Sequence, residues 1–154
     1  MPATRLQYGV SIRIDRPIDE VFAYLADPVN GMRHDPSIVS VRRTSEGPLA
    51  TGATFRQVGR DTLGAERVYQ LSILEHRPPT KLVFHGTGST PGYERTTYVL
   101  EPVDGGTRLL VSHAGTDLGM KGPVAAMVKH VAKQHAHGAL TRLKHYLESP
   151  ERRP

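Results

Sequence analysis

The sequence predicts an α+β domain in which a curved antiparallel sheet of seven strands wraps around one long C-terminal helix, with two short helices after the first strand. Three observations lead to this fold class. Stretches in which apolar and polar residues alternate dominate residues 8–116, as in half-buried strands. Short turn sequences join most of these stretches, which is typical of an antiparallel sheet. In residues 122–147, apolar residues instead recur at three- and four-residue steps, as on a helix.

The first strand and the two short helices follow from local signals. Residues 8–14 form the first predicted strand, because apolar side chains alternate with polar ones along them. Pro17 predicts the start of a helix, since the missing N–H of proline costs nothing at the first helical position. Asp27-Pro28 predicts the end of that helix, and a short second helix is expected over residues 29–33.

Six further strands are predicted at residues 38–43, 51–60, 65–75, 81–87, 93–101 and 107–116. The sequence Pro78-Pro79 separates the third of these from the fourth, because proline cannot donate to a ladder. Asp104-Gly105-Gly106 joins the last two strands and predicts a hairpin, since these residue types tolerate a positive φ.

The final helix is predicted to begin at Gly122-Pro123 and to run to about Leu147. One helix cannot cover both faces of so large a sheet, so we expect the sheet to curve around it and to enclose a cavity that could bind a small molecule. The stripe expected to face the sheet comprises Val128, Val131, Ala132, His135, Ala139, Leu143 and Tyr146.

Length and composition limit the class of protein. The 154 residues suffice for one domain with its own core, which we expect at residues 1–148, followed by a frayed tail at 149–154. The absence of cysteine excludes disulfides, thiol catalysis and cysteine-ligated metals. No apolar stretch approaches the ~20 residues of a membrane-spanning helix, and no signal-peptide pattern opens the chain. We therefore expect a cytoplasmic protein.

The net charge of +5 has a definite location. Residues 121–147 contain no acid, and they contain Lys121, Lys129, Lys133, Arg142 and Lys144. Such a basic face suggests a transient contact with an anionic membrane or an acidic protein, although a solvated helix face is the simpler interpretation. A nucleic acid is not favoured, because Tyr146 is the only aromatic residue in the segment.

Several motifs, taken in order, resemble a known superfamily. They lie at residues 16–27, 75–82, 98–102, 106–109 and 143–148. Together they resemble the START and birch-pollen-allergen superfamily, in particular its polyketide cyclase/dehydrase and lipid-transport family. The resemblance spans almost the whole chain and implies a helix-grip fold. Members often carry a tryptophan just before the second strand, where this sequence has His34 and the chain has no tryptophan.

A set of polar residues is expected inside the cavity. Alternation places His113 on the same side as Leu109, and Tyr98 on the same side as Leu100. A few convergent polar groups in an apolar pocket can orient a ligand, and histidine can also move protons near neutral pH. Each could equally be a satisfied buried polar residue. The candidate ligand-binding residues are His34, Tyr69, Glu94, Tyr98, His113 and His135.

Other motifs fail on geometry. Ligands on one helix face need a spacing of three or four, whereas His130, His135 and His137 are spaced by five and two, so no metal site is expected. No helix follows the glycine-rich segment 86–92, so a phosphate loop is not favoured and no cofactor is expected.

The sequence therefore favours a carrier or sensor that binds a small hydrophobic or aromatic molecule, lipid-like or polyketide-like, in an internal cavity. One alternative is a cofactor-independent enzyme of the polyketide cyclase or aromatase kind, in which histidine or tyrosine would move protons. A further alternative is a binding module that docks through its basic last helix. The ligand and the oligomeric state stay open.

Overall fold

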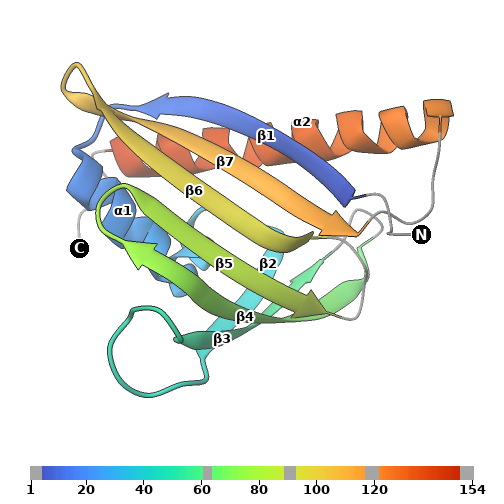
Figure 1. Ribbon diagram of the computed structural model, residues 1–154, viewed down its shortest axis with the longest axis horizontal. Helices are drawn as coiled ribbons and strands as arrows, with labels where there is room; N and C mark the ends of the chain where they lie inside the picture. Colours follow the sequence, from blue (N-terminus) through green and yellow to red (C-terminus); the bar gives the residue numbers. More distant parts are fainter. Residues whose placement is uncertain (1–4, 61–63, 89–92, 117–121, 150–154) are drawn as a thin grey trace.

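The structure is a computed structural model that describes residues 5–60, 64–88, 93–116 and 122–149 (Figure 1). Seven antiparallel strands form one curved sheet, two short helices follow the first strand, and a long helix ends the described chain. The predicted fold is thereby confirmed. The elements are β1 (Arg5–Ile14), α1 (Ile18–Ala26), η1 (Pro28–Arg33), β2 (Ile38–Arg43), β3 (Thr54–Arg60), β4 (Glu66–Arg77), β5 (Lys81–Gly88), β6 (Tyr93–Val103), β7 (Gly106–Thr116) and α2 (Gly122–Glu148).

The strand order β1-β7-β6-β5-β4-β3-β2 places the first two strands at opposite edges of the sheet. α1 and η1 carry the chain from one edge to the other. Figure 1 shows α2 running along the β1 and β7 side of the sheet, while α1 lies at the end where α2 finishes. Residues of α2 and of the inner face of the sheet line a cavity.

The register of the last two strands fixes which side chains point inward. Leu100 pairs with Leu109, and Tyr98 pairs with Val111. Leu100, Leu109 and Val111 are all buried in the core. Because side chains alternate along a strand, Thr96 and His113, which also pair, lie on the same inner face.

The C-terminal half of α2 holds the helix to the sheet through Leu140, Leu143 and Leu147, which are all buried. Polar contacts fix the same end: Lys144 Nζ donates to the carbonyl oxygen of Arg13 at 2.8 Å, and Glu148 Oε2 accepts from the backbone N–H of Asp15 at 2.7 Å. The end of α2 is therefore tied to the point where β1 leads into α1.

The N-terminal half of α2 differs from the predicted packing. Val131 is 42% exposed and His135 is also exposed, so the prediction that both lie on the buried stripe is wrong. Figure 1 shows the first turns of α2 extending past the start of β1. Helical periodicity reveals which residues share a face, but it does not reveal how far along the helix the sheet extends.

No helix among the described residues combines the length and the hydropathy needed to cross a membrane.

Candidate ligand-binding site

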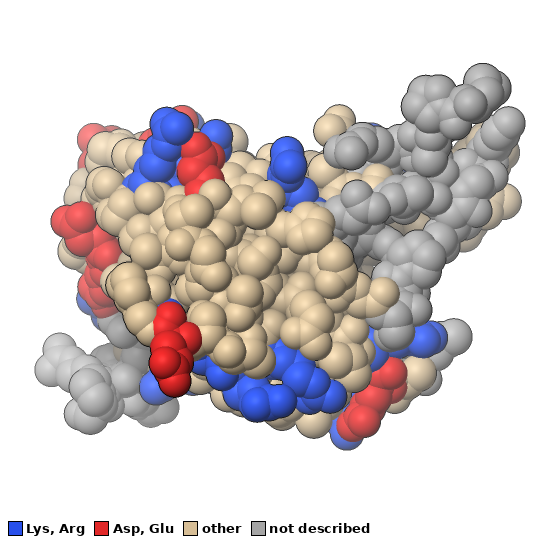
Figure 2. All heavy atoms as spheres, turned by 60° about the horizontal axis from the view of Figure 1, so that its bottom comes forward, with Lys and Arg blue, Asp and Glu red and all other residues tan. Residues whose placement is uncertain are grey.

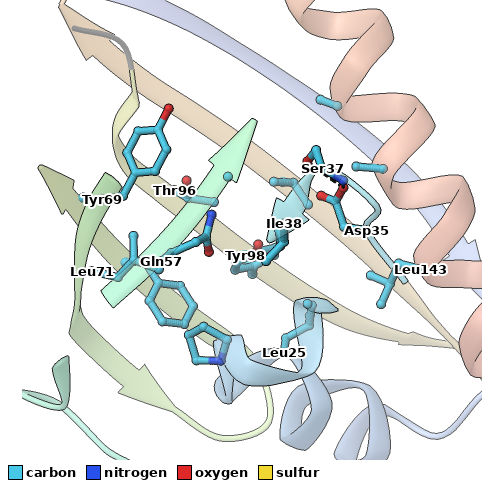
Figure 3. A pocket seen from close by; sticks show the side chains of 18 of the residues that line it. Leu25, Asp35, Ser37, Ile38, Gln57, Tyr69, Leu71, Thr96, Tyr98 and Leu143 are labelled. Carbon is cyan, nitrogen blue, oxygen red and sulfur yellow. Dashed lines mark hydrogen bonds between the residues drawn. The ribbon is translucent and has the colours of Figure 1, made fainter. Parts of the chain in front are cut away.

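A cavity of about 410 Å³ lies between α2, the segment around η1 and the inner face of the sheet (Figure 3). Its volume falls within the ~300–1,000 Å³ range of small-molecule sites. The apolar part of its wall includes Leu25, Ile38, Leu71, Phe84, Val111, Ala136, Ala139, Leu140 and Leu143. The cavity therefore has apolar side chains from α1, from α2 and from strands of the sheet in its wall.

Three polar side chains of β6 and β7 form what we call the polar row: Thr96, Tyr98 and His113. All three line the cavity. Thr96 Oγ1 lies 3.1 Å from His113 Nδ1, and the ring of Tyr8 packs beside His113 with centroids 5.2 Å apart. Their common orientation follows from the register, because Thr96 pairs with His113 and Tyr98 is two residues further along β6.

Burial keeps the polar row uncharged. It lowers the pKa of His113 to about 4, because the imidazolium form loses its hydration. It raises the pKa of Tyr98 to about 12, and the nearby carboxylate of Asp35 acts in the same direction. Near neutral pH the row therefore offers a neutral imidazole and two hydroxyl groups.

A second polar group lies where η1 meets α2. The hydroxyl of Tyr24 lies 2.7 Å from His34 Nδ1 and 2.9 Å from the carbonyl oxygen of Asn30. The ring of Tyr146, on α2, packs 5.5 Å from that of Tyr24. Burial lowers the pKa of His34, with Asp35 acting in the opposite direction, and burial raises the pKa of Tyr24. His34 is therefore held by aromatic neighbours and lines the cavity as a neutral base.

The loop after η1 brings a carboxylate to the cavity. Asp35 Oδ1 accepts hydrogen bonds from the backbone N–H of Ser37 at 2.9 Å and from its hydroxyl at 2.7 Å. Short Asp-to-backbone bonds of this kind fix a turn locally. Figure 3 shows both side chains on the α2 side of the cavity. Asp35 is the acidic group that influences both Tyr98 and His34.

At the other side of the cavity, Gln57 and Tyr69 project from β3 and β4 (Figure 3). They are direct cross-strand partners, as are Phe55 and Leu71 on the same face. Gly88 pairs with Tyr69, and a Cβ at Gly88 would lie 2.5 Å from the Tyr69 ring. The glycine therefore leaves space for this ring at the end of β5.

The structure brings together four of the six candidate residues. His34, Tyr69, Tyr98 and His113 line the cavity. His135 instead borders an open hollow between α2 and residues 35–37, which we call the side hollow. The side chain of Glu94 lies outside the described residues.

The candidate set from the sequence lacked several polar residues of the cavity wall, and Tyr24, Asp35, Ser37 and Gln57 are among them. Gln57 could have been found from the sequence, because residues two apart on a strand point to the same side, so Gln57 shares one face of β3 with Phe55 and Gly59. The positions of Tyr24, Asp35 and Ser37 depend on helix rotation and loop conformation, which residue alternation does not describe. The described residues contain no group of three His, Asp or Glu side chains that could hold a metal ion.

A curved sheet that grips a C-terminal helix around a lined cavity defines the helix-grip class. The chain belongs to the polyketide cyclase/dehydrase and lipid transport family, whose model matches residues 5–148.

Solved structures share the fold at low sequence identity. Ara h 8.0201 is 20% identical with a TM-score of 0.67, over 93% of this chain and 97% of that one. The Zhui aromatase/cyclase from Streptomyces sp. R1128 is 17% identical with a TM-score of 0.73, over 90% and 91%. The di-domain ARO/CYC BexL from the BE-7585A biosynthetic pathway is 18% identical with a TM-score of 0.75, over 99% of this chain but 52% of BexL. A comparison with curated protein sequences gives no match.

Proposed function

We propose that this protein binds a small, largely apolar or aromatic molecule in the cavity and acts as its carrier or sensor. The observation that carries the proposal is a cavity whose wall is largely apolar and in which the polar row of Thr96, Tyr98 and His113 projects from the floor of the sheet. Burial of the apolar body provides affinity, and the few polar groups orient the ligand.

The protonation states restrict the polar part of the ligand. His113 is neutral near pH 7, because burial lowers its pKa to about 4. Tyr98 keeps its proton, because its pKa is about 12. The polar row therefore supplies no cation to balance a buried anion, and the Asp35 carboxylate adds negative charge nearby. Arg60 and Arg95 also line the cavity, but both are exposed, so their charges lie in solvent and not beside the row. We expect a neutral carbonyl or hydroxyl oxygen to contact this row.

Native mass spectrometry of the purified protein, followed by titration with a fluorescent apolar probe, tests this proposal. His113→Leu and Tyr98→Phe each remove one polar contact and should weaken binding of a carbonyl-bearing probe several-fold, since such a contact contributes ~0.5–1.5 kcal/mol. Ser112→Ala is the matched control, because Ser112 is the exposed neighbour of His113 on the same strand. Equal affinity in all four proteins would refute a role for the row, and no probe binding to wild type would refute the proposal.

A second candidate function is a cyclase-like enzyme, and the Tyr24–His34 contact favours it. A neutral histidine with a fixed hydrogen-bond partner can serve as a general base, while Tyr98 can donate a proton to a carbonyl oxygen. Two proteins that share the fold are the aromatase/cyclase Zhui and the di-domain ARO/CYC BexL.

The enzymatic candidate predicts turnover of a linear poly-ketone thioester, detected as a cyclised or dehydrated product by liquid chromatography and mass spectrometry. His34→Gln should then abolish product formation while retaining binding of the apolar probe. Probe binding without turnover by wild type would leave the carrier function and exclude this enzymatic one. A polyketide synthase gene nearby in the genome would support the enzymatic candidate.

A further inference from the structure

The N-terminal half of α2 carries an exposed apolar stripe. Val124, Met127 and Val131 are 58%, 68% and 42% exposed. Their spacing of three and four residues places them on one side of the helix. With the sheet in place these side chains stay exposed, so no part of the protein that the structure describes covers the stripe. Contiguous exposed apolar side chains of this kind mark contact surfaces.

The opposite side of the same turns is basic. At 100° per residue, Lys129, Lys133 and His137 fall on the arc facing away from the stripe, and His130 lies at its flank. No acidic residue occurs between positions 122 and 147. On the face shown in Figure 2, by contrast, side chains of both charges lie around an uncharged centre. The first half of α2 therefore combines an apolar arc with an arc whose charged residues are all basic, which is the pattern of helices that lie in a membrane interface.

The stripe adjoins the side hollow, which shares part of its wall with the main cavity. Val131 lines the side hollow together with Ala132 and His135. The side hollow and the main cavity share Asp35, Ser37 and His113 in their walls. A flat apolar surface placed against the stripe would therefore face the hollow as well.

We propose that the N-terminal half of α2 docks on the surface of anionic lipid bilayers. The stripe enters the boundary between headgroups and acyl chains, and the basic side chains remain at headgroup level, where they attract anionic lipid. Charge selects this partner over a second copy of the chain, because a second copy would present the same acid-free helix and no complementary negative charge, whereas anionic lipid provides it. The surface is independent of the proposed ligand, so either proposal can fail without the other.

Vesicle flotation tests the proposal, with phosphatidylcholine vesicles compared with an equimolar mixture of phosphatidylcholine and phosphatidylglycerol. Wild type should float with the anionic vesicles and should be released as salt is raised, because the attraction is screened. The double variant Met127→Ser/Val131→Ser should bind about tenfold more weakly or not at all. Removal of one lysine charge should lower the affinity for anionic vesicles roughly fivefold. Lys129→Glu/Lys133→Glu should lower this affinity by more than that for each lysine, because each charge is reversed.

Leu110→Ser is the matched control, since Leu110 is an exposed apolar side chain on β7 away from α2. It should float like wild type. Circular dichroism should show every variant folded, because the altered side chains are exposed. Failure of wild type to bind, equal binding to both kinds of vesicle, or equal binding by the Met127/Val131 variant would each overturn the proposal. So would a wild-type dimer in sedimentation that Met127→Ser disrupts, since the stripe would then be covered by a second copy.

Discussion

The hydroxyl of Tyr24 lies 2.7 Å from Nδ1 of His34, and this contact assigns the tautomer of the histidine. The hydroxyl has one proton and also lies 2.9 Å from the carbonyl oxygen of Asn30, which can only accept. When the proton points to Asn30, Nδ1 of His34 must donate to the Tyr24 oxygen. The Nε2 atom of His34 is then left without a proton and can accept one.

Tyr24→Phe should therefore shift neutral His34 away from the Nδ1-protonated tautomer. The variant removes the oxygen that Nδ1–H donates to, so that tautomer loses its partner. Long-range ¹H–¹⁵N spectra of the histidine rings measure the change directly. The loss of two hydrogen bonds should also lower the free energy of unfolding by about 1–2 kcal/mol. Unchanged ring ¹⁵N shifts of His34 would show that Tyr24 does not set the tautomer.

The depressed pKa of His113 should make the protein less stable in mild acid. Above pH ~6.5, His113 is neutral in both folded and unfolded chains and contributes no pH dependence. Between pH ~6.5 and about 4, the unfolded chain binds a proton that the folded chain does not, so unfolding becomes easier as the pH falls.

Urea unfolding of wild type and His113→Phe at pH 7 and pH 5 measures this effect. Between pH 7 and pH 5, the free energy of unfolding of wild type should fall by about 1–2 kcal/mol more than that of the variant. Parallel losses in the two proteins would mean that His113 titrates normally in the fold. The contribution of His34 is present in both proteins and cancels.

The two halves of α2 should respond differently to truncation of apolar side chains. Leu147 is 0% exposed at the anchored end, so Leu147→Ala should lower the free energy of unfolding by about 2–5 kcal/mol. Val124→Ala, at the exposed end, should change it by no more than about 0.5 kcal/mol. Chemical denaturation of both variants checks the contrast. Similar losses would show that the first turns of α2 pack against the protein.

The two glycines of the β6–β7 hairpin should differ in their tolerance of a side chain. Gly105 has a φ of 79° and no atom near the place of a Cβ, so Gly105→Asn should cost little, because Asn accepts this conformation. A Cβ at Gly106 would lie 2.7 Å from the carbonyl oxygen of Ile14, so Gly106→Ala must displace the backbone of β1. Thermal unfolding should show a clearly larger loss for Gly106→Ala, by roughly 1–3 kcal/mol. Equal losses would contradict this close approach.

The fold could be predicted from the sequence because it depends on local patterns. Alternation predicted the strands, and Asp104-Gly105-Gly106 predicted a hairpin that the structure confirms, with Pro102 paired to Thr107. The same alternation correctly placed His113 and Tyr98 on the inner face, since one correct register fixes every side chain of a strand.

The rest of the cavity wall depends on relations that no local pattern contains. Tyr24 reaches the cavity through the way α1 packs, and Asp35 through a turn that its own bonds to Ser37 define. His135 was misplaced for a related reason. Its neighbours are apolar, but the sheet does not extend far enough to cover that part of α2.

The pairing of β1 with β7 has a consequence for synthesis on the ribosome. β1 is made first, but β7, the one strand that pairs with it within the described ranges, begins at Gly106. At ~5–20 residues per second, roughly 5 to 20 s pass before that partner exists. During this time the apolar face of β1, including Ile14, has no sheet to join and is a natural target for chaperones. The sheet is completed only when β7, near the end of the chain, pairs with β1, near its start. A chain whose synthesis stops before β7 therefore cannot complete its core.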